Sequence, residues 1–478
     1  MQSFQQAQPP LRFLPPQPNR AVLTATRLLM PYWLRWRENL HRVESHNLDP
    51  LVYLMRDFQA EKHRFLLAFR HPSSQDAFCM AHLLWYDVPR RARELGIPLQ
   101  QPVHAHFIYD RGIPLWAGAW VGGFYSRLGG TPIQRGKLDR QGLRLARHLF
   151  AHGQWPMAAA PEGGNNGHTE LISPLEPGIA QMGFWCVNDL QQAERLEQVS
   201  ILPVGLTYEY RSPPWERLDQ WLDGLEQETG LLATAQTVNV AEGGRDPVAE
   251  GTDPARGTDV TMQRRYQRLL ALGEHLLGVM EDYYQRVYQM PVATQPSPFA
   301  DRLEALRNAA LQVAETYFHL PPRGTLIDRC RRIEQAGWER IFRQELGEDQ
   351  PLSSVARGLA DREAEEASLR MWHMRLVENF VAVTGQYVQE RPTAERFAET
   401  LMIVRDIVWL IKGKNPFPRP NLGPQVATVT VGEPLSVSDR WPAYKASRKQ
   451  AVAELTTDLQ LALESMITGC EFRGGERR

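Results

Sequence analysis

Short apolar runs alternate with helical stretches between residues 62 and 210, and this alternation limits the possible folds more than any other feature of the sequence. The runs have the length of strands, and the stretches between them repeat apolar residues every three or four positions, which is typical of amphipathic helices. Strands joined through helices favour a mostly parallel sheet, because parallel strands need a long crossover. We therefore expect an α/β fold with helices flanking the sheet and with strands at Phe65–Phe69, Val103–Tyr109, Met157–Ala160 and Val199–Tyr208.

The chain changes character after Tyr210. Residues 234–260 are rich in Gly, Asp, Thr and Ala, a composition that predicts a flexible loop. Apolar residues between Leu269 and Val287 then recur at helical spacing. We expect residues 215–424 to form a large all-helical insertion, with further helices at 299–319, 324–346, 365–389 and 393–413.

Strand composition returns at residues 426–435, and residues 444–467 are predicted to form a closing helix. A lone strand is not stable, because its backbone donors and acceptors need neighbouring strands. The simplest place for this strand is the sheet formed earlier in the chain. Residues 62–214 and 425–470 are therefore expected to form one α/β domain that is interrupted by the helical insertion.

The first 61 residues divide into two parts. Residues 1–19 are rich in Gln and Pro and are predicted to be a disordered or extended lead. Residues 20–61 are predicted to form amphipathic helices, and Trp, Leu and Arg are interleaved between Arg20 and His41. Two interpretations stay open for this segment: a helix lying in a membrane interface, or a helix packing its aromatic face on the core.

The composition excludes several classes of protein. A formal net charge of -1 gives no argument for a nucleic-acid partner, which favours a basic surface. The four cysteines lie far apart with no CxxC pair, which argues against a disulfide scaffold or a zinc site and fits a reducing compartment. No apolar stretch is long enough to span a bilayer, and no signal-peptide core is present. We expect a cytoplasmic protein that reaches any lipid substrate by associating peripherally with the membrane surface.

The first motif with chemical meaning is a His-x4-Asp pair, His71 and Asp76, directly after the strand at 65–69. Ligands of open α/β sheets bind at the carboxyl ends of strands, which is where His71 lies. A carboxylate that accepts a hydrogen bond from one ring nitrogen makes the other nitrogen a better base toward an alcohol. The alternative is structural, because Ser73 to Asp76 also match a capping box at a helix start.

A second His-x4-Asp pair, His82 and Asp87, is predicted to be structural. Apolar and aromatic residues fill the interval between the two side chains, which indicates that both lie within one helix. Five residues along an α-helix place two side chains on different faces. We therefore expect these two side chains to lie apart.

Three further motifs follow along the chain. A tight Gly129–Pro132 turn precedes Arg135, whose guanidinium could bind a phosphate, with surface charge as the alternative. The run Pro161–Gly167 follows an apolar strand and contains Glu162, which can accept hydrogen bonds from hydroxyls, and glycines that let the backbone approach a ligand. The run Ile201–Gly205 is apolar and is predicted to be a buried strand end.

In this order the four motifs resemble those of the lysophospholipid acyltransferase family, represented by 1-acylglycerol-3-phosphate acyltransferases. The resemblance extends over about residues 62–210 and, more loosely, over Val429–Pro434 and the helix after it. It implies that the protein has the glycerolipid acyltransferase-like fold. It also implies transfer of a fatty acyl group from an acyl-CoA or an acyl-acyl-carrier protein to the hydroxyl of a lysophospholipid.

The resemblance also implies the role of each residue. His71 would deprotonate the acceptor hydroxyl, and Asp76 would orient it. Arg135 would bind the acceptor phosphate, and Glu162, Gly163 and Gly164 would help to hold the acceptor. No covalent acyl-enzyme, metal or other cofactor is implied.

The third motif departs from the family pattern, which continues with Thr and Arg where this chain has Gly164 and Asn165. Without that Arg, a glycolipid or another hydroxylated lipid without a phosphate becomes an alternative acceptor. A non-catalytic lipid- or acyl-carrier-binding protein on the same fold is a second alternative. A serine hydrolase is set aside, because the chain contains no Gly-x-Ser-x-Gly elbow.

Overall fold

A computed structural model describes residues 4–134, 139–231, 254–292, 297–347, 352–380 and 385–468. The chain divides into two compact units, which are described separately below. The α/β unit consists of Leu11–Arg211 and Gly423–Arg478, and the helical unit of Met1–Pro10 and Ser212–Leu422. The expected boundaries were 62–214 with 425–470 for the α/β domain and 215–424 for the insertion, so the α/β unit begins earlier than expected.

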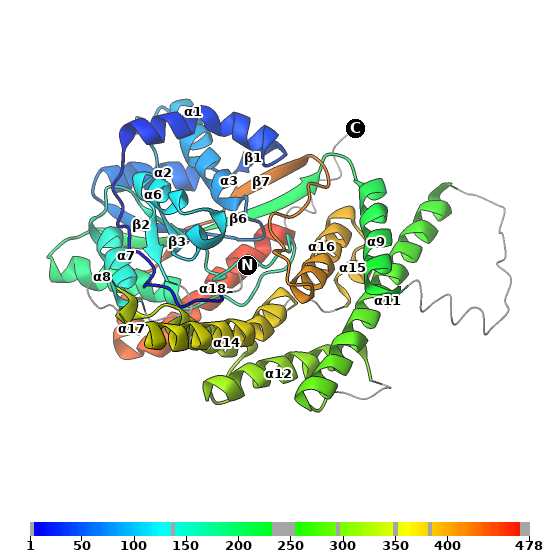
Figure 1. Cartoon of the computed structure of the whole chain (residues 1–478). Coiled ribbons are helices and arrows are strands. Elements are labelled where there is room, and N and C mark those ends of the chain that lie inside the picture. The colour runs from blue at the N-terminus through cyan, green and yellow to red at the C-terminus, as the bar shows by residue number, and fades with distance from the viewer. Residues whose placement is uncertain are drawn as a thin grey trace, which may run out of the picture. The chain divides into compact units, whose positions relative to one another are not determined.

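The α/β unit is built on one mostly parallel, mixed sheet (Figure 1). All neighbouring strands are parallel except where β6 pairs antiparallel with β7 and β8. The predicted α/β class, with a mostly parallel sheet flanked by helices, is therefore confirmed. In sheet order the strands are β1 (Leu40–His46), β7 (Gln425–Val431), β6 (Gln198–Tyr210), β2 (His63–Phe69), β5 (Met157–Ala159), β3 (His106–Asp110) and β4 (Thr131–Ile133), with β8 (Leu435–Ser436) beside β6.

Two strands escape the sequence analysis. Residues 20–61, expected to be only helical, contain β1, an edge strand whose polar and charged residues give no apolar run. Residues 131–133, expected as part of a turn, form β4 at the other edge, where three residues are too few for a periodic signal. Both strands are defined by pairing with distant segments, which a local pattern does not report.

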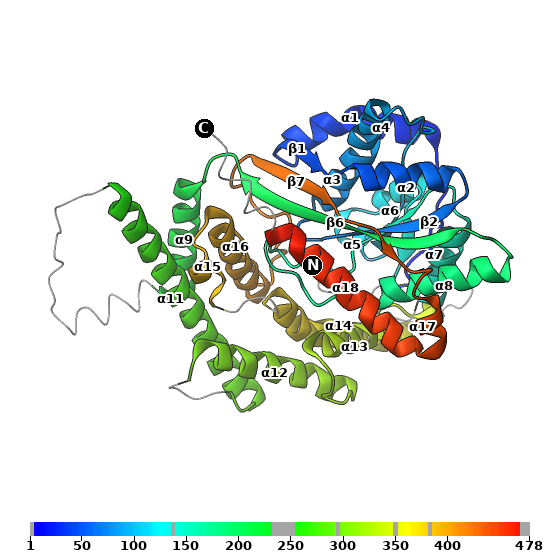
Figure 2. The ribbon, with the colours of Figure 1, turned by 180° about the vertical axis from the view of Figure 1, so that it is seen from behind.

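Helices cover both faces of the sheet, which explains why residues 65–69 of β2 are continuously apolar. Phe65 and Leu67 of β2 pack with helices α1 (Arg20–Trp36) and α2 (Asp49–Gln59). Leu66 and Ala68 pack on the opposite face with helices α7 (Arg140–His152), α8 (Gly178–Gln192) and α18 (Arg448–Thr468), two of which stand out in Figure 2 as α8 and α18. A strand buried on both faces has no polar alternation.

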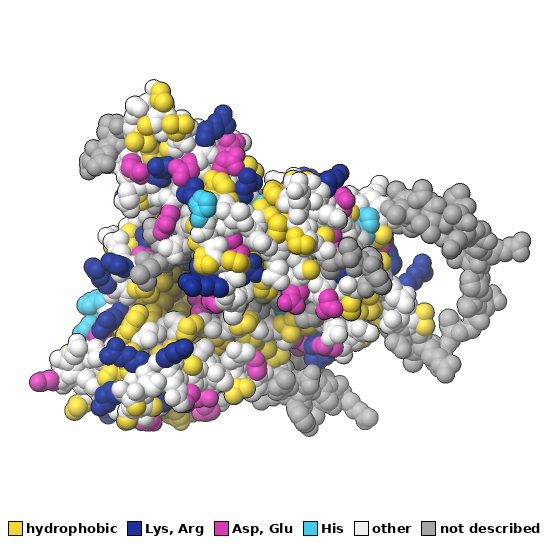
Figure 3. Space-filling model, turned by 90° about the horizontal axis from the view of Figure 1, so that it is seen from below, with side chains coloured by type: hydrophobic (Ala, Val, Ile, Leu, Met, Phe, Trp, Pro, Cys, Tyr) yellow, Lys and Arg dark blue, Asp and Glu magenta, His cyan; other side chains and the backbone are white. Residues whose placement is uncertain are grey.

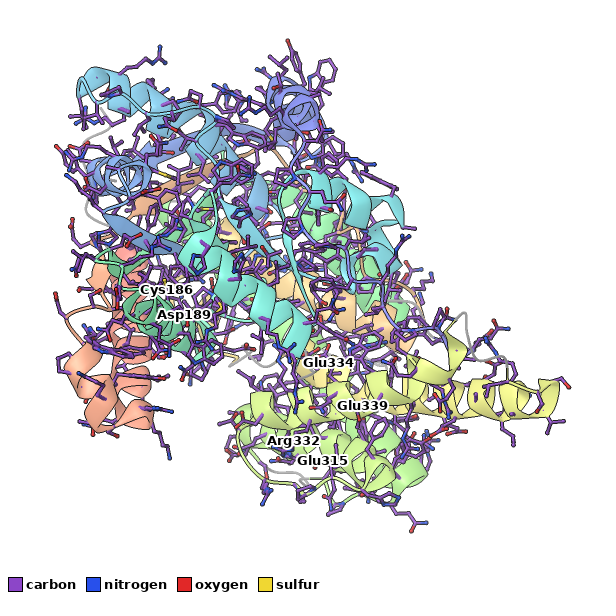
Figure 4. All side chains as sticks on the ribbon, turned by 90° about the vertical axis from the view of Figure 1, so that its left-hand side faces the viewer. Cys186, Asp189, Glu315, Arg332, Glu334 and Glu339 are labelled. Carbon is purple, nitrogen blue, oxygen red and sulfur yellow. The ribbon has the colours of Figure 1, made fainter. Side chains whose placement is uncertain are left out.

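Shorter helices complete the α/β unit. The segment after β2 continues as α3 (Asp76–His82), a π-helical turn (Leu83–Asp87) and α4 (Val88–Glu94). The remaining short helices are α5 (Ile113–Ala117), α6 (Trp120–Arg127) and α17 (Trp441–Ala446). Asp189 on α8, labelled in Figure 4, accepts two hydrogen bonds from Arg147 of α7 at 2.7 and 2.5 Å, which join neighbouring helices on one face of the sheet.

The described part of the helical unit contains helices and no strand. Its helices are α9 (Trp215–Thr229), α11 (Pro254–Tyr288), α12 (Phe299–Phe318), α13 (Leu326–Ile341), α14 (Ser354–Asn379), α15 (Tyr387–Glu390) and α16 (Ala394–Ile411), with a 3-10 turn at Gln344–Leu346. The predicted helices overlap these, but α14 begins and ends about ten residues before the expected 365–389. Of the loop expected at 234–260, residues 234–253 lie outside the described residues, and residues 254–260 belong to α11.

Arginine–carboxylate pairs join successive helices of this unit. Arg302 of α12 donates to both carboxylate oxygens of Glu281 on α11, at 3.0 and 2.5 Å. Arg329 of α13 binds both oxygens of Glu315 on α12, which is labelled in Figure 4, at 2.8 Å each. Such paired bonds fix the relative rotation of two helices as well as their distance.

Acidic and basic side chains are interspersed on the face of the molecule shown in Figure 3, in keeping with the net charge of -1.

The N-terminal lead, expected to be disordered or extended, is extended over its described residues, 4–19. The amides of Phe4 and Ala7 donate to Ser368 Oγ and Asp361 Oδ1 of α14, at 3.0 and 2.9 Å. Gln8 forms a parallel bridge with Phe342. These bonds to the helical unit satisfy a backbone that would otherwise need water, so the Gln- and Pro-rich segment is ordered without being helical.

Over the described ranges, every helix is too short or too polar to cross a bilayer.

His104 offers a test of the α/β core. Its Nδ1 accepts a hydrogen bond from Trp85 Nε1 at 3.0 Å, and its Nε2 donates to the Leu128 carbonyl at 2.8 Å. Burial lowers the pKa of His104 to about 4. Because an unfolded histidine titrates near 6.5, the unfolded state binds the proton more tightly, and stability falls as the pH drops from about 6.5 to about 4.

We predict that this single group costs about 2 kcal/mol of unfolding free energy between pH 7 and pH 5. Urea titrations at both pH values measure the loss. In His104→Gln, which cannot gain a proton, the loss between the two pH values should shrink by that amount, although the variant starts from a lower stability at pH 7. An equal loss in both proteins would contradict the prediction.

Candidate active site

The predicted pair is formed: His71 Nδ1 lies 2.8 Å from Asp76 Oδ2. His71 lies just beyond the carboxyl end of β2, a central strand between β6 and β5. Asp76 is the first residue of α3, so a turn of four residues brings the carboxylate back toward the ring. The His71 side chain is 29% exposed, whereas the Asp76 side chain is fully buried. A ring that can meet a ligand is thus held by a carboxylate that cannot.

The Asp76 carboxylate is held by three donors. Oδ2 accepts from the Ser73 amide at 2.9 Å as well as from His71, and Oδ1 accepts from the Tyr208 hydroxyl of β6. The bond to Ser73 is the contact that the capping interpretation expected. One oxygen thus holds both the turn and the ring. The capping interpretation is otherwise not met, because α3 has Gln75 at its N-cap position and no side-chain cap hydrogen bond.

This arrangement defines the tautomer of His71. A carboxylate only accepts, so Nδ1 carries the proton and Nε2 has the free lone pair, as inferred from the hydrogen bonds. Within the described ranges, no side chain or backbone group forms a hydrogen bond with Nε2. A neutral imidazole in this state can accept a proton from a hydroxyl.

Glu162 is present at the site, but it faces inward. One carboxylate oxygen accepts from the His71 amide at 2.8 Å. The other accepts from Asn166 Nδ2 at 2.9 Å and from the Ser173 amide at 3.1 Å. The side chain is fully buried, so these internal donors take up the lone pairs that the resemblance assigned to an acceptor. The geometry supports a different role for Glu162, which is to fix the backbone from which the His71 ring projects.

Arg70 is a residue that the sequence analysis missed. Its buried guanidinium donates to the carbonyls of His168 and Leu171, at 3.2 and 2.6 Å, and to that of Thr169. Its Nε lies 3.7 Å from Glu162 Oε1. The guanidinium thereby ties the loop after β5 to the end of β2. The signal was an arginine at the end of a wholly apolar strand, where an unpaired charge would be costly.

The glycines of the third motif shape this loop. Gly163 has φ of 67° and Gly167 has φ of 72°, a backbone region that other L-residues adopt rarely. Gly164 lies between them and is half-buried. The loop can therefore turn back so that Asn166 reaches Glu162. No ligand contact of Gly163 or Gly164 follows from these observations.

Arg135, the predicted phosphate ligand, lies outside the described residues, as does the rest of 135–138. Asp139 makes contacts on both sides of that gap. It accepts from the amides of Gln134 and Gly142, at 2.8 and 3.0 Å, and pairs with Arg111 after β3. Asp139 thus caps α7 and connects it to the end of β4.

The second His-x4-Asp pair also forms, which corrects the expectation that its side chains lie apart. His82 Nδ1 is 3.2 Å from Asp87 Oδ2. The interval Leu83–Asp87 is a π-helical turn, and its wider turn brings positions five residues apart onto one face. The environment differs from that of the first pair, because Asp87 also accepts from the guanidinium of Arg90 at 2.8 Å.

Among the described residues, no group of three or more His, Cys, Asp or Glu side chains could hold a metal ion. Comparison with protein-family models, with curated proteins and with solved structures finds no match to this chain.

Truncating Glu162 tests its supporting role. Glu162→Ala leaves the part-buried amides of His71 and Ser173 without their acceptor, and each donor left unsatisfied away from water costs about 1–3 kcal/mol. We expect a loss of about 3 kcal/mol in the unfolding free energy, measured by urea denaturation. Glu454→Ala, on the exposed side of α18, is the matched control and should change it by less than about 0.5 kcal/mol. Equal effects in both variants would contradict this role.

Proposed function

We propose that this protein is an acyltransferase with the glycerolipid acyltransferase-like fold. It transfers a fatty acyl group from an acyl-CoA or acyl-carrier-protein thioester to the hydroxyl of a lysophospholipid such as 1-acylglycerol-3-phosphate. The observation that carries the proposal is the His71–Asp76 pair at the carboxyl edge of a mostly parallel sheet. The ring is partly exposed, and no hydrogen bond reaches its Nε2 from the described residues. The resemblance in motif order supports it, since the first, third and fourth motifs follow or lie on the neighbouring strands β2, β5 and β6.

In this mechanism Nε2 of His71 removes the proton of the acceptor hydroxyl while the oxygen attacks the thioester carbonyl carbon. The Asp76 carboxylate stabilises the imidazolium that forms. When the tetrahedral intermediate collapses, the new C–O bond remains and the C–S bond breaks. The proton on Nε2 then passes to the departing thiolate, which restores the neutral ring without a covalent acyl-enzyme.

Two observations bear on the head group of the acceptor. Arg70 is buried and its guanidinium is bound to carbonyls, so it supplies no phosphate contact. The third motif lacks the arginine that the family pattern has there. A glycolipid or another hydroxylated lipid therefore remains the alternative acceptor, and a lipid- or acyl-carrier-binding protein without activity remains the alternative function.

Helix α1 supports a peripheral position on a membrane surface, which we propose to be the cytoplasmic one. Its inward face is aliphatic, with Leu23, Met30 and Leu34 buried, so the helix does not pack its aromatic face on the core. The outward face contains no acidic residue and presents large apolar side chains that are 46–80% exposed: Leu28, Leu29, Tyr32, Trp33 and Trp36. Exposed aromatic and aliphatic residues beside arginines are typical of helices in a membrane interface.

Replacing the proposed base tests the activity. Transfer from labelled acyl-CoA and acyl-carrier protein to a panel of lysophospholipids and glycolipids should fall about 10²- to 10⁴-fold in His71→Ala, the usual contribution of a general base. His82→Ala is the matched control, because it removes the ring of the other His–Asp pair, and it should retain activity. The acceptor that reacts identifies the substrate class.

Two results would count against the proposal. Transfer that survives His71→Ala would remove His71 as the base. Absence of transfer to every acceptor, with folded protein and intact donors, would favour the binding-protein alternative.

The membrane interaction is tested by substitution on α1. Deleting the first 42 residues would cut into β1, so Leu29→Ser with Trp36→Ser is the cleaner change. We expect at least a severalfold loss of binding to vesicles of phosphatidylcholine and phosphatidylglycerol in a sedimentation assay, because two exposed apolar anchors are lost. Leu461→Ser, at an exposed position of α18, serves as the control. Unchanged binding of the double variant would exclude α1 as the docking helix.

A further inference from the structure

The buried carboxylate of Asp76 has a partner that the motif pattern does not contain. Tyr208 lies on β6, the strand beside β2, and its hydroxyl donates to Asp76 Oδ1. The other oxygen, Oδ2, faces His71 Nδ1 and the Ser73 amide. Each oxygen of the carboxylate therefore has its own set of donors, and the donor to Oδ1 comes from 132 positions away in the chain.

We infer that Tyr208 is a positioning residue for His71, acting through Asp76 by holding the plane of the carboxylate so that Oδ2 stays directed at Nδ1. This inference rests on the proposed role of His71 as the base. Without the Tyr208 hydroxyl, Oδ1 would be an unsatisfied buried acceptor, and the carboxylate could rotate about Cβ–Cγ to satisfy it. That rotation would lengthen or break the bond that keeps the proton on Nδ1.

Tyrosine suits this position because it orients the carboxylate without neutralising it. Burial raises the pKa of Tyr208 well above its usual value, and the neighbouring Asp76 acts in the same direction, so the hydroxyl remains a donor at any working pH. The second pair offers a contrast, because the guanidinium of Arg90 offsets the charge of Asp87. At the first site the full negative charge of Asp76 is left to stabilise an imidazolium on His71.

The nearby thiol of Cys79 does not replace this contact. Its Sγ lies 3.5 Å from the Tyr208 hydroxyl, and the single hydroxyl proton already goes to Asp76, so the thiol can only donate to the phenol oxygen. Burial raises the pKa of Cys79, which keeps it a neutral, weak donor. The Cys79 thiol thus donates to the Tyr208 oxygen, and the Tyr208 hydroxyl donates to the Asp76 carboxylate. The carboxylate also accepts from His71 Nδ1.

The test is Tyr208→Phe, which removes one oxygen atom and little volume. Nitrogen NMR of protein labelled with ¹⁵N-histidine, with the His71 signal assigned by its loss in His71→Gln, reports which ring nitrogen is protonated. We expect mainly the Nδ1–H tautomer in the native protein and a several-fold rise of the Nε2–H tautomer in Tyr208→Phe. In the acyl-transfer assay kcat should fall about tenfold or more with KM unchanged, as expected when a base is misoriented and binding is not.

Two comparisons separate positioning from a general effect on folding. Tyr210→Phe, on the same face of β6, should leave the His71 tautomer and kcat as they are. A 3,5-difluorotyrosine at position 208, whose hydroxyl is a stronger donor, should increase the Nδ1–H population and not decrease it. Thermal melting of each variant shows that the fold is retained.

An unchanged tautomer in Tyr208→Phe would overturn the inference, whether or not the melting temperature of the variant is lower. A tautomer shift in a protein that transfers no acyl group to any acceptor would support the positioning role of Tyr208. The same result would reject the proposed enzymatic function, so the two failures are distinguishable.

Discussion

The buried contact between Arg70 and the loop after β5 is the interaction on which the site depends. A guanidinium at the end of an apolar strand must find acceptors, and here it finds the carbonyls of three residues in that loop. The loop in turn carries Glu162, whose carboxylate binds the amide of His71. One buried cation thus draws together the two strand ends from which the candidate site is built.

The two His–Asp pairs show why a short motif does not define a function. Both pairs form hydrogen bonds through Nδ1, one across a turn between strand and helix and the other across a π-helical turn. They differ in what surrounds the carboxylate, since Asp76 is buried with neutral donors and Asp87 also pairs with Arg90. Only the first pair stands at the carboxyl end of a central strand, where α/β sheets bind their ligands.

Much of the fold follows from local patterns in the chain. Continuous apolar runs predicted β2, β5 and β6, because strands buried on both faces carry no polar alternation. Helical spacing predicted the helical unit. The polar edge strand β1 and the short strand β4 were missed, because each is held by partners far away in sequence and has no strong pattern of its own.

For the candidate site, the sequence alone determined the pairing of His71 with Asp76, because a strand end, a turn and a helix start bring positions five residues apart into contact. The tertiary structure decided the rest. It turned Glu162 inward to the His71 amide, 91 positions away, and it brought Tyr208 to Asp76 across 132 positions. It also decided that α1 buries its aliphatic face and exposes its aromatic one. Such contacts depend on which strands and helices become neighbours, and no local spacing encodes that choice.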